Sequence, residues 1–461
     1  GQRRIPVPRG KLLGGSSSIN GMVFTRGQSQ DYDIWAQLGN RGWSYSDVLP
    51  IFKEMESYKG EADEEYRGRD GVLKVSESLE TGPLYDAIIK AASEAGIEYT
   101  KDYNGASQDG IGMSQTTIRN GRRMSTAYCY LDPARSRNNL TIQANALTEC
   151  VLFEGKRCTG VRYRHKGATV EAKATREVVI SAGAINSPQL LELSGIGQAE
   201  RLKTLGIEVQ QELPGVGENL RDHYAPRLKW TIPDNLGITY NVKGRGVRLV
   251  WEALKYAFTD RGLLGMSAAP LRAFIRTRAG LEAPNAVIGW VPFFMTENFK
   301  LSERSGVTAF MHILRSESTG NIHLKSSDPT APPAINFNFL SAQLDRDVTL
   351  EAIRIARNVM TAPALQGIIT EEISPGSSMD DDDSLLNWVR QTAETTYHPV
   401  GTCKMGSDAM AVVDERLRVH GIDGLRIADA SIMPTLTSGN TNAPSIMIGE
   451  KCSKMMLADI P

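Results

Sequence analysis

Several common features are missing from this sequence, and each absence narrows the possible functions. No apolar run approaches the roughly 18 to 20 residues that a helix needs to cross a bilayer. Cysteine is scarce, and the five cysteines show neither C-x-x-C spacing nor the density of a disulfide framework: Cys129, Cys150, Cys158, Cys403 and Cys452. This usage fits a reducing compartment, so we expect a cytoplasmic protein without a metal site.

An excess of charge of one sign is also missing. The 52 lysines and arginines nearly balance the 53 aspartates and glutamates, and we therefore expect no nucleic-acid partner. The 461 residues, which include 43 glycines, are enough for two or three loop-rich domains with a sizeable core. The chain opens with Gly1 and runs directly into motif-like sequence, so a targeting segment could precede it.

Strand, turn and helix signals follow one another in residues 146–195. LTECVLF, VRYRH and VVIS read as strands separated by turns. The last strand leads into a turn at Gly183, a helix opened by Ser187 and Pro188, and a stop at Gly195. A strand that ends in a glycine turn and a helix is the unit of a doubly wound α/β sheet, which binds ligands at the carboxyl ends of its strands.

The same pattern returns near the end of the chain. GLRIADA (424–430) reads as a strand, and the segment after Pro444 places four apolar residues on one helical face: Ile448, Cys452, Met455 and Met456. From about 230 to 400 the segments are longer and mixed, and the acidic stretch 379–384 predicts a solvated loop or a helix N-terminus. The nucleotide-binding part is therefore predicted to be discontinuous, with a second domain inserted in it.

Polar residues in four places are candidates for a site, and each also has an ordinary structural explanation. The glycine–serine loop 14–21, which enters a short helix, can bring backbone N–H groups close to an anion, although most such loops are plain turns. His398 is one of six histidines, and a lone histidine is usually structural. Asn440 and Asn442 are typical of turns or helix caps, and Asp429, directly after a strand, is typical of an N-cap.

Taken together and in order, these motifs resemble the glucose–methanol–choline (GMC) oxidoreductase family. The resemblance runs from the first residues to the last and is carried by RGKLLGGSSSINGMVFTRG, DYDIWAQLGNRGWSYSDVLP, VVISAGAINSPQLLELSGIG, ELPGVGENLRDH, TYHPVGTCKMG and GLRIADASIMPTLTSGNTNAPSIMIGEK. The second of these reads by itself as two helical pieces separated by a glycine–aromatic turn. The nearest likeness is to the bacterial branch of choline dehydrogenases and aliphatic primary-alcohol dehydrogenases.

The resemblance implies an α/β (α+β) flavoprotein with two domains. We expect a discontinuous, Rossmann-like FAD-binding domain in residues 1–30, 140–225 and 408–461, and a lid or connecting segment in residues 31–75. Residues 76–139 and 226–407 are expected to form a substrate domain of antiparallel sheet and helices. Members of the family begin with a βαβ unit that carries a G-x-G-x-x-G turn. This sequence has no such turn, so a segment of roughly 70 to 80 residues that carries it is expected to precede the chain.

The resemblance also implies the chemistry. In the family an alcohol loses its hydroxyl proton to a base and its α-hydride to flavin N5, and an alcohol is converted to the aldehyde. His398 matches the base, and we expect Asn442 to be its partner on the facing loop and to hydrogen-bond the alkoxide oxygen. The helix that follows Pro444 is expected to direct its N-terminus at the flavin N1/O2 edge.

Further matches to the family predict the residues that contact FAD. The loop along the flavin and pyrophosphate, the adenosine side, the ribityl–phosphate region and the last helix are predicted to contribute Gly14, Gly15, Ser16, Asn20, Gly21, Met22, Val23, Thr148, Ala182, Gly183, Asp429, Ala430, Asn442 and Pro444. Some relatives attach FAD covalently through a histidine in the GGSSSIN loop. Because Ile19 stands there in this sequence, we expect FAD to be non-covalent.

Several functions remain open at this stage. The first is a dehydrogenase that passes electrons to a quinone or other acceptor, with membrane association as an alternative to a freely cytoplasmic protein. The others are an oxidase that uses O₂, a lyase that keeps the flavin without redox turnover, and a degenerate or truncated chain that binds no FAD. Apolar candidates for the substrate pocket are Trp290, Phe293, Phe294 and Met295, which favour a medium-sized, uncharged alcohol, although core packing explains such residues equally well.

Overall fold

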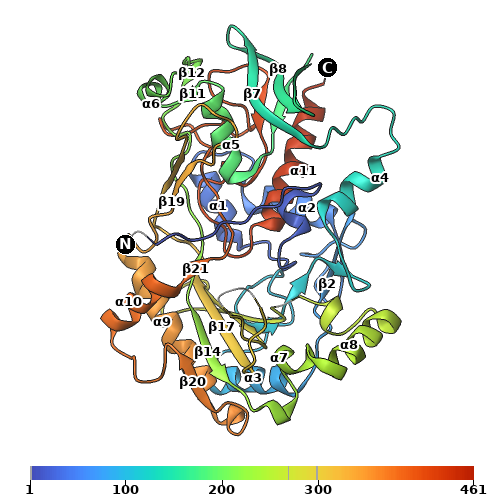
Figure 1. Ribbon diagram of the computed structural model, residues 1–461, viewed down its shortest axis with the longest axis vertical. Helices are drawn as coiled ribbons and strands as arrows, with labels where there is room; N and C mark the ends of the chain where they lie inside the picture. Colours follow the sequence, from blue (N-terminus) through green and yellow to red (C-terminus); the bar gives the residue numbers. More distant parts are fainter. Residues whose placement is uncertain (1–2, 268, 297–299, 461) are drawn as a thin grey trace.

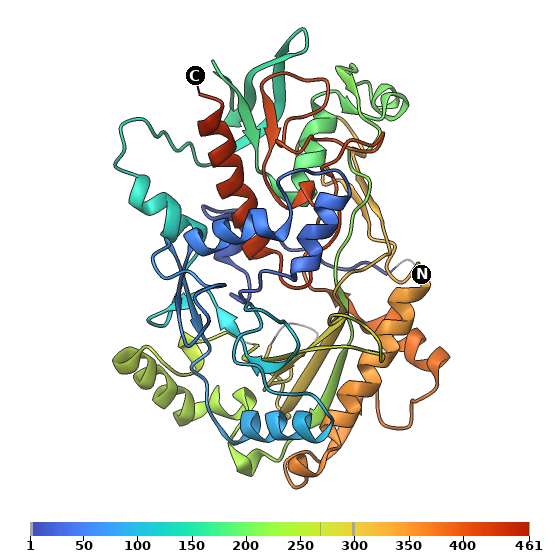
Figure 2. The ribbon, with the colours of Figure 1, turned by 180° about the vertical axis from the view of Figure 1, so that it is seen from behind.

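The computed structural model describes residues 3–267, 269–296 and 300–460. The molecule is elongated and has two halves that share one cavity (Figures 1 and 2). All five cysteines are unpaired. None of the helices formed by the described residues has both the length and the apolar character that crossing a bilayer requires.

The upper half in Figure 1 is built around a short parallel pair of strands, β10 (Val178–Ile180) and β22 (Leu425–Ile427). A three-stranded meander lies beside it, formed by β7 (Ala146–Glu154), β8 (Arg157–His165) and β9 (Ala168–Lys173). Helices α5 (Gly183–Leu193) and α11 (Asn442–Ala458) follow the two parallel strands in the chain. The strands predicted in residues 146–183 and at 424–430, and the helix predicted near Pro444, are therefore confirmed.

Helix α5 begins at Gly183, so the predicted opening at Ser187 and Pro188 was wrong. A proline inside a helix removes one backbone hydrogen bond, and here the carbonyl left without a partner is that of Ala184. The Thr402 hydroxyl donates to that carbonyl at 2.7 Å. A distant side chain thus compensates for the proline, which the local sequence could not indicate.

The segment predicted as two helical pieces forms α1 (Ser29–Gln37) and α2 (Tyr45–Met55). Both helices bury aromatic residues in the core of the upper half, where the ring centroids of Trp35 and Trp43 are 6.0 Å apart. Helix α11 packs against α2. These contacts connect the chain's first helices to its last one.

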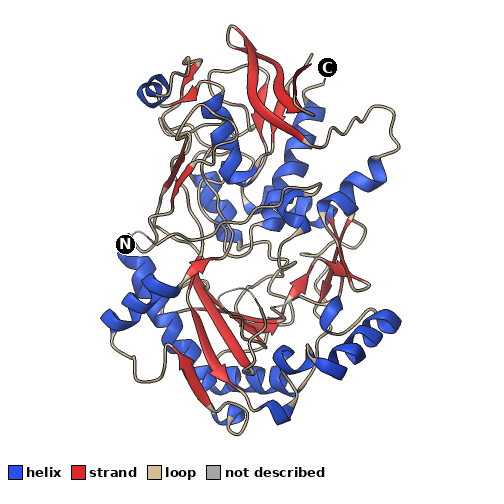
Figure 3. Ribbon diagram, in the orientation of Figure 1, coloured by secondary structure: helices blue, strands red, loops and turns tan. Residues whose placement is uncertain are grey.

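The lower half contains a six-stranded antiparallel sheet, drawn in red in Figure 3. Its strand order is β20 (Glu371–Ser374), β14 (Arg227–Thr231), β17 (Gly306–Ile313), β16 (Ala286–Val291), β15 (Leu271–Ile275) and β3 (Gly110–Met113). Helices α3 (Pro83–Glu94) and α9 (Gln343–Met360) pack on the sheet. All six strands come from 76–139 and 226–407, the ranges predicted for the substrate domain, while the domain boundaries stay a prediction.

Helix α10 (Asp382–Thr392) accounts for the acidic stretch 379–384. The Asp381 side chain caps it by accepting the N–H of Ser384 at 2.9 Å, which agrees with the predicted helix N-terminus. The remaining elements are short, apart from α8: η1 (Gly15–Ser18), β1 (Glu56–Lys59), β2 (Leu73–Glu77), β4 (Gln115–Thr116), β5 (Ile118–Arg119), β6 (Arg122–Arg123), η2 (Ala127–Leu131), α4 (Asp132–Ala134), β11 (Ile196–Gly197), α6 (Ala199–Thr204), β12 (Gln211–Glu212), β13 (Tyr224–Ala225), η3 (Asp234–Leu236), α7 (Tyr240–Lys243), α8 (Gly246–Thr259), η4 (Leu263–Gly265), β18 (Asn321–His323), β19 (Ala334–Asn336), η5 (Pro363–Leu365), β21 (Glu394–Thr395) and η6 (Ala430–Ile432).

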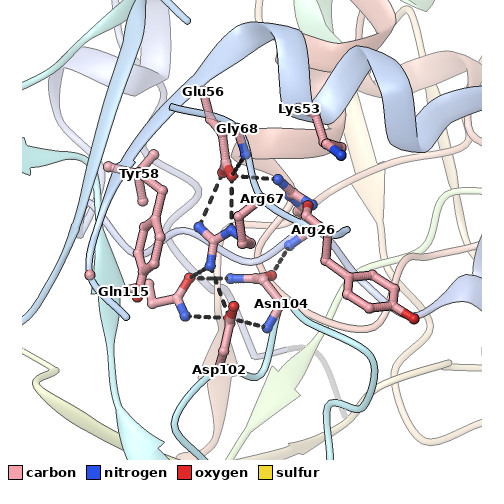
Figure 4. Close-up of polar contacts among 12 residues, drawn as sticks. Arg26, Lys53, Glu56, Tyr58, Arg67, Gly68, Asp102, Asn104 and Gln115 are labelled. Carbon is pink, nitrogen blue, oxygen red and sulfur yellow. Dashed lines mark hydrogen bonds and ion pairs between the residues drawn. The ribbon is translucent and has the colours of Figure 1, made fainter. Parts of the chain in front are cut away.

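A buried cluster of charges joins β1 to loops of the lower half (Figure 4). The Glu56 carboxylate is fully buried, forms an ion pair with Arg26 at 2.6 Å and accepts a hydrogen bond from Arg67 at 2.8 Å. Arg67 also donates to Asp102 at 2.9 Å and to Gln115 at 2.8 Å. Because every charge in such a cluster needs its partners when water is excluded, removing one carboxylate is costly. The cluster therefore holds residues 56–67 against residues 102–115.

Candidate active site

One large cavity lies where the two halves meet. It measures about 1440 Å³, which exceeds the roughly 300 to 1,000 Å³ of a typical small-molecule site. Strands β14 to β17 of the lower sheet form part of its wall, together with the glycine–serine loop, the first turn of α5 and the first turns of α11. The volume leaves room for a large cofactor and a second, smaller molecule.

Most of the residues predicted to contact a cofactor line this cavity. These are Gly14, Gly15, Ser16, Asn20, Gly21, Met22, Val23, Ala182, Gly183, Asp429, Ala430 and Asn442. Thr148 lies within β7 and Pro444 within the first turn of α11, and neither is among the lining residues. The structure thus brings together twelve of the fourteen, from four separate stretches of the chain.

The glycines of the cavity wall leave space that a larger residue would fill. At Gly15 and Gly183 a Cβ atom would have no neighbour within 4 Å, and both residues have positive φ, +52° and +80°. Asn20 supports the same loop, because its side-chain carbonyl accepts the N–H of Met22 at 3.0 Å. Bare backbone beside an open cavity suits the close approach of a flat ring or a phosphate. The residues present therefore fit a dinucleotide cofactor.

Asp429 hydrogen-bonds the starts of two helices at the cavity wall. One carboxylate oxygen accepts the N–H of Gly183 at 2.9 Å and the hydroxyl of Ser187 at 2.5 Å, and the other accepts the N–H of Ser431 at 2.8 Å. This carboxylate caps α5 and η6 together, which is the N-cap alternative considered from the sequence. Asp429 thereby fixes the positions of both helix starts along the cavity.

His398 lies in the cavity wall. The residue is 9% exposed, and its Nε2 lies 2.9 Å from the Asn440 side-chain nitrogen. Its Nδ1 lies 2.8 Å from the Thr396 hydroxyl and 3.0 Å from Nδ1 of His223. The preceding residue, Tyr397, has φ +66°, a conformation that bulky residues rarely adopt and that concentrates at functional sites.

A chain of hydrogen bonds determines which nitrogen of His398 carries the proton. The Nε2 of His223 donates to the Leu314 carbonyl at 2.8 Å, so the Nδ1 of a neutral His223 is an acceptor. The Nδ1–H of His398 must then donate to it. The Nε2 of His398, a residue of the cavity wall, is then left unprotonated, which is the state a proton acceptor requires.

The hydrogen bonds on the Nε2 side of His398 indicate the same tautomer independently. Arg272 donates to the side-chain carbonyl of Asn440 at 3.0 Å, which turns the amide N–H₂ of Asn440 toward His398. The amide donates there, so Nε2 of His398 must accept. Among the described residues, the amide in contact with His398 is therefore that of Asn440, whereas Asn442, expected in that position, begins α11 and contacts the cavity.

Burial keeps these imidazoles neutral. Desolvation lowers the pKa of His398 well below its ordinary value, and the nearby cations Arg9 and Arg272 add to the effect. Desolvation likewise lowers the pKa of His223 to about 4 and that of His312 well below the ordinary range. A buried imidazole without a carboxylate partner prefers the uncharged form. His398 is thus held in its neutral form.

Arg272 places a buried positive charge beside this group. The residue is 4% exposed, burial lowers its pKa, and no salt bridge to it is formed by any carboxylate in the described part of the chain. Its partners are neutral: Ser114 at 3.1 Å and Asn440. A desolvated cation without a counter-ion favours negative charge that develops nearby.

His223, His312 and His398 together could be considered as a metal site, since their ring nitrogens lie within 4.8 Å of one another. Most of those nitrogens already have partners, however. Besides the contacts above, Nδ1 of His312 bonds the Ile313 carbonyl at 2.9 Å. Metal ligation would require several of these lone pairs at once. We therefore interpret the cluster as a hydrogen-bonded group around His398 and not as a set of metal ligands.

Asp222 holds the backbone of His398 and His223 in place and was not predicted. Its carboxylate accepts the backbone N–H of His398 at 2.9 Å and that of His223 at 2.8 Å. Burial raises the pKa of Asp222 to about 7, although these hydrogen bonds oppose the shift. The DH pair in ELPGVGENLRDH, which carries Asp222 and His223, was a signal for both residues, but nothing local linked it to His398, 175 residues later.

The apolar candidates for the substrate pocket divide into two pairs. Phe293 and Met295 line the cavity, whereas Trp290 and Phe294 are buried in the core of the lower half. Successive side chains of an extended chain point to opposite faces, which explains the alternation. Phe310, from β17, adds a second aromatic side chain to the cavity wall.

Known proteins resemble the chain over most of its length. A model described as GMC oxidoreductase matches residues 1–225, and a second model of that description matches residues 316–449. An oxygen-dependent choline dehydrogenase from Brucella anthropi is 42% identical, over 100% of this chain and 84% of that protein. The oxygen-dependent choline dehydrogenase 1 of Chromohalobacter salexigens is 44% identical, over 97% of this chain and 81% of that protein.

Solved structures also match the chain in fold. A pyridoxine 4-oxidase from Mesorbium loti has a TM-score of 0.89 at 26% identity, and the match covers 100% of this chain and 86% of that one. A formate oxidase from Aspergillus oryzae has a TM-score of 0.92 at 26% identity, over 99% of this chain and 85% of that one. The mixed α/β fold with an antiparallel sheet is therefore shared with enzymes of this kind.

Proposed function

This chain belongs to the GMC oxidoreductase family, and on that premise we propose that it oxidises an alcohol to the aldehyde with FAD as cofactor. The alcohol gives up its hydroxyl proton and a hydride from its α-carbon. Bound FAD supplies the hydride acceptor. The observation that carries the proposal is the directional hydrogen-bond chain that leaves Nε2 of His398 unprotonated at the cavity wall.

His398 takes the hydroxyl proton at Nε2. Since the pKa of His398 is low in the empty site, it accepts the proton only as the alkoxide forms and its charge can be shared. The Asn440 amide, which donates to this Nε2 at 2.9 Å, must turn from it to the substrate oxygen as the alcohol enters. There it and the Arg272 guanidinium stabilise the developing negative charge. Proton acceptance and charge stabilisation are thus provided by separate residues.

The cofactor is held by the glycine-rich wall of the cavity. The proposed contacts are the loop residues Gly14 to Val23, the turn at Ala182 and Gly183, and Asn442 at the start of α11, whose helix dipole favours negative charge at that end. Because Ile19 offers no nucleophile, the attachment is non-covalent. Acid precipitation tests this: FAD should stay in the supernatant, and yellow protein in the pellet would contradict it.

The proposed substrate is an uncharged alcohol with an apolar body. Phe293, Met295 and Phe310 provide apolar wall. The sheet also places Arg227 at the cavity, where it is paired with Glu394, and Arg272, which has no carboxylate partner among the described residues. Choline is the second candidate, because the curated relatives are named choline dehydrogenases, but its cation would meet the buried positive charge of Arg272.

An anaerobic screen separates these substrates. Flavin absorbance is followed after aliphatic primary alcohols, aromatic alcohols or choline are added without oxygen. Bleaching by uncharged alcohols, at lower concentrations than choline requires, supports the proposal. Preferential bleaching by choline would assign the substrate to the second candidate. No bleaching by any alcohol would remove alcohol oxidation and favour a lyase that does not use the redox chemistry of its flavin.

The proposed electron acceptor is a quinone. The second candidate is O₂, which is favoured by the names of the oxygen-dependent relatives. Turnover with a quinone analogue and with air is compared at equal substrate concentration. Faster turnover with the quinone supports the proposal, and stoichiometric peroxide at a comparable rate in air would make the protein an oxidase.

A further inference from the structure

Helix α8 carries an apolar stripe on the outside of the protein. The helix has 14 residues and buries none of them, and it lies at the outer edge of the lower half (Figures 1 and 2). Five apolar side chains at helical spacing share one face and are exposed: Val247 71%, Val250 56%, Trp251 68%, Leu254 42% and Phe258 84%. Single exposed apolar residues are ordinary, but a contiguous stripe marks an interaction surface.

The opposite face of α8 attaches the helix to the protein. The Glu252 carboxylate accepts the N–H of Leu263 at 2.8 Å, and the Tyr256 hydroxyl donates to the Gly121 carbonyl at 3.4 Å. At about 100° per residue, Glu252 and Tyr256 lie roughly 140° to 180° around the helix from Val247. The apolar stripe therefore points away from the protein, and no described residue covers it.

The charge around the stripe indicates what covers it. Residues 243–261 contain two acidic residues, Glu252 and Asp260, and five basic ones, Lys243, Arg245, Arg248, Lys255 and Arg261. Glu80, from outside this segment, lies near Lys243 and Lys255, which leaves five basic and three acidic residues. The excess of positive charge is therefore local, because the chain as a whole has a net charge of −1. A helix with tryptophan, phenylalanine and leucine on one face and basic residues around it is typical of a helix that lies in the interface of a membrane.

A second copy of the chain fits this surface less well. In a symmetric dimer the same patch meets itself, which would bring the basic residues of two copies together. An anionic phospholipid surface instead complements them. The charge therefore favours lipid over a dimer.

The stripe also lies near the cavity rim. Met295 lines the cavity and pairs with Leu301 in an isolated bridge. A Leu301 methyl group lies 3.0 Å from where a Cβ of Gly244 would be, two residues before α8. A surface that covers α8 would therefore lie next to this side of the cavity.

We propose that α8 docks the protein on a bilayer that contains anionic phospholipid. Trp251 and Phe258 enter the region between headgroups and acyl chains, while Arg248 and Lys255 contact the headgroups. Docking brings the rim near Met295 to the membrane, where a lipid-soluble quinone is dissolved. The link to the quinone rests on the proposed function, whereas docking itself does not.

Trp251 provides a selective signal for the test. It is the exposed tryptophan, since the other five are buried: Trp35, Trp43, Trp230, Trp290 and Trp388. FAD-loaded protein is mixed with vesicles of phosphatidylcholine alone or with phosphatidylglycerol added, and binding is measured by flotation. Binding should require phosphatidylglycerol, shift Trp251 emission to shorter wavelength and protect it from iodide. Unchanged emission and quenching with bound vesicles would overturn the proposal.

Variants distinguish binding through the α8 stripe from nonspecific adsorption to vesicles. Trp251→Ser combined with Phe258→Ser should weaken vesicle binding by about tenfold or more, and Arg248→Glu with Lys255→Glu should abolish the requirement for phosphatidylglycerol together with most binding. Leu79→Ser, at a side chain that is 65% exposed elsewhere, is the matched control and should change nothing. Equal binding by all these proteins would overturn the proposal.

Two further outcomes are separated by design. A dimer in sedimentation that disappears in the Trp251→Ser and Phe258→Ser variant, without vesicle binding, would assign the surface to a second copy and overturn the proposal. Anaerobic flavin reduction by alcohol, measured without vesicles, should be equal in wild type and the α8 variants. If wild type binds vesicles but no alcohol reduces its flavin, the proposed function fails while docking stands.

Discussion

Replacing Asn440 with alanine tests the hydrogen-bond chain at its centre. The change removes the N–H₂ that donates to His398 at 2.9 Å and the carbonyl that accepts from Arg272 at 3.0 Å. Loss of one donor at developing negative charge typically costs about 10² to 10³ in rate. Loss of a hydrogen bond to a buried charged group costs about 1.5 to 3 kcal/mol of stability. Asn440→Ala should therefore slow flavin reduction by about 10²-fold or more and lower the unfolding free energy by about that amount.

Two companion variants separate the two effects. Asn440→Asp keeps an acceptor for Arg272 but has no N–H to donate to His398, so its stability should be retained while reduction is slow. Asn442→Ala should change the rate less than about tenfold, because no hydrogen bond joins Asn442 to His398, whose side chain bonds His223, Thr396 and Asn440. Rates are measured by stopped-flow absorbance under anaerobic conditions, and stability by urea unfolding. Near-normal reduction in Asn440→Ala together with a large loss in Asn442→Ala would refute the reasoning.

Three further predictions concern the base and the core. Because burial lowers the pKa of His398 well below 6.5, the rate of flavin reduction should stay level as pH falls from 8 through 6.5 and decline only below that; a decline centred at 6.5 would contradict a buried, neutral base. His223→Ala removes the acceptor that selects the His398 tautomer, so reduction should slow by about tenfold or more while bound FAD, measured by absorbance, is unchanged; an unaltered rate would remove His223 from the mechanism. Glu56→Ala leaves Arg26 and Arg67 buried without their carboxylate, so urea unfolding should show a loss of about 3 to 5 kcal/mol, and a loss below about 1 kcal/mol would mean that water or Asp102 compensates.

Much of the fold could be predicted because its signals are local. Strand alternation in residues 146–180 and the glycine turn at Gly183 depend on neighbouring residues, and the elements they predicted are present. The start of α5 could not be placed, because the hydroxyl of Thr402 satisfies the carbonyl that Pro188 leaves free, and it comes from more than 200 residues away. Local pattern identifies elements, whereas contacts distant in the chain set their ends.

The candidate site was likewise predicted in part. Family motifs identified His398 and the glycine loop, but two asparagines in GNTNAP are equally good candidates when only spacing is known. The structure distinguishes them, because α11 begins at Asn442 and leaves Asn440 in the loop, where Arg272 orients its amide. The apolar stripe on α8 could not be identified as exposed from the sequence, because a buried and an exposed apolar face have the same helical periodicity. Only the fold shows that this face is exposed.

The central claim is that His398 accepts the substrate proton, and its most direct measurement is flavin reduction in His398→Ala. FAD content is measured first by absorbance, because the glycine-rich wall does not depend on this side chain and binding should be intact. Anaerobic reduction by the best alcohol is then followed in wild type and variant. We expect the variant to be slower by about 10²- to 10⁴-fold, the usual contribution of a positioned base. Reduction at a near-normal rate, with FAD fully bound, would contradict the account.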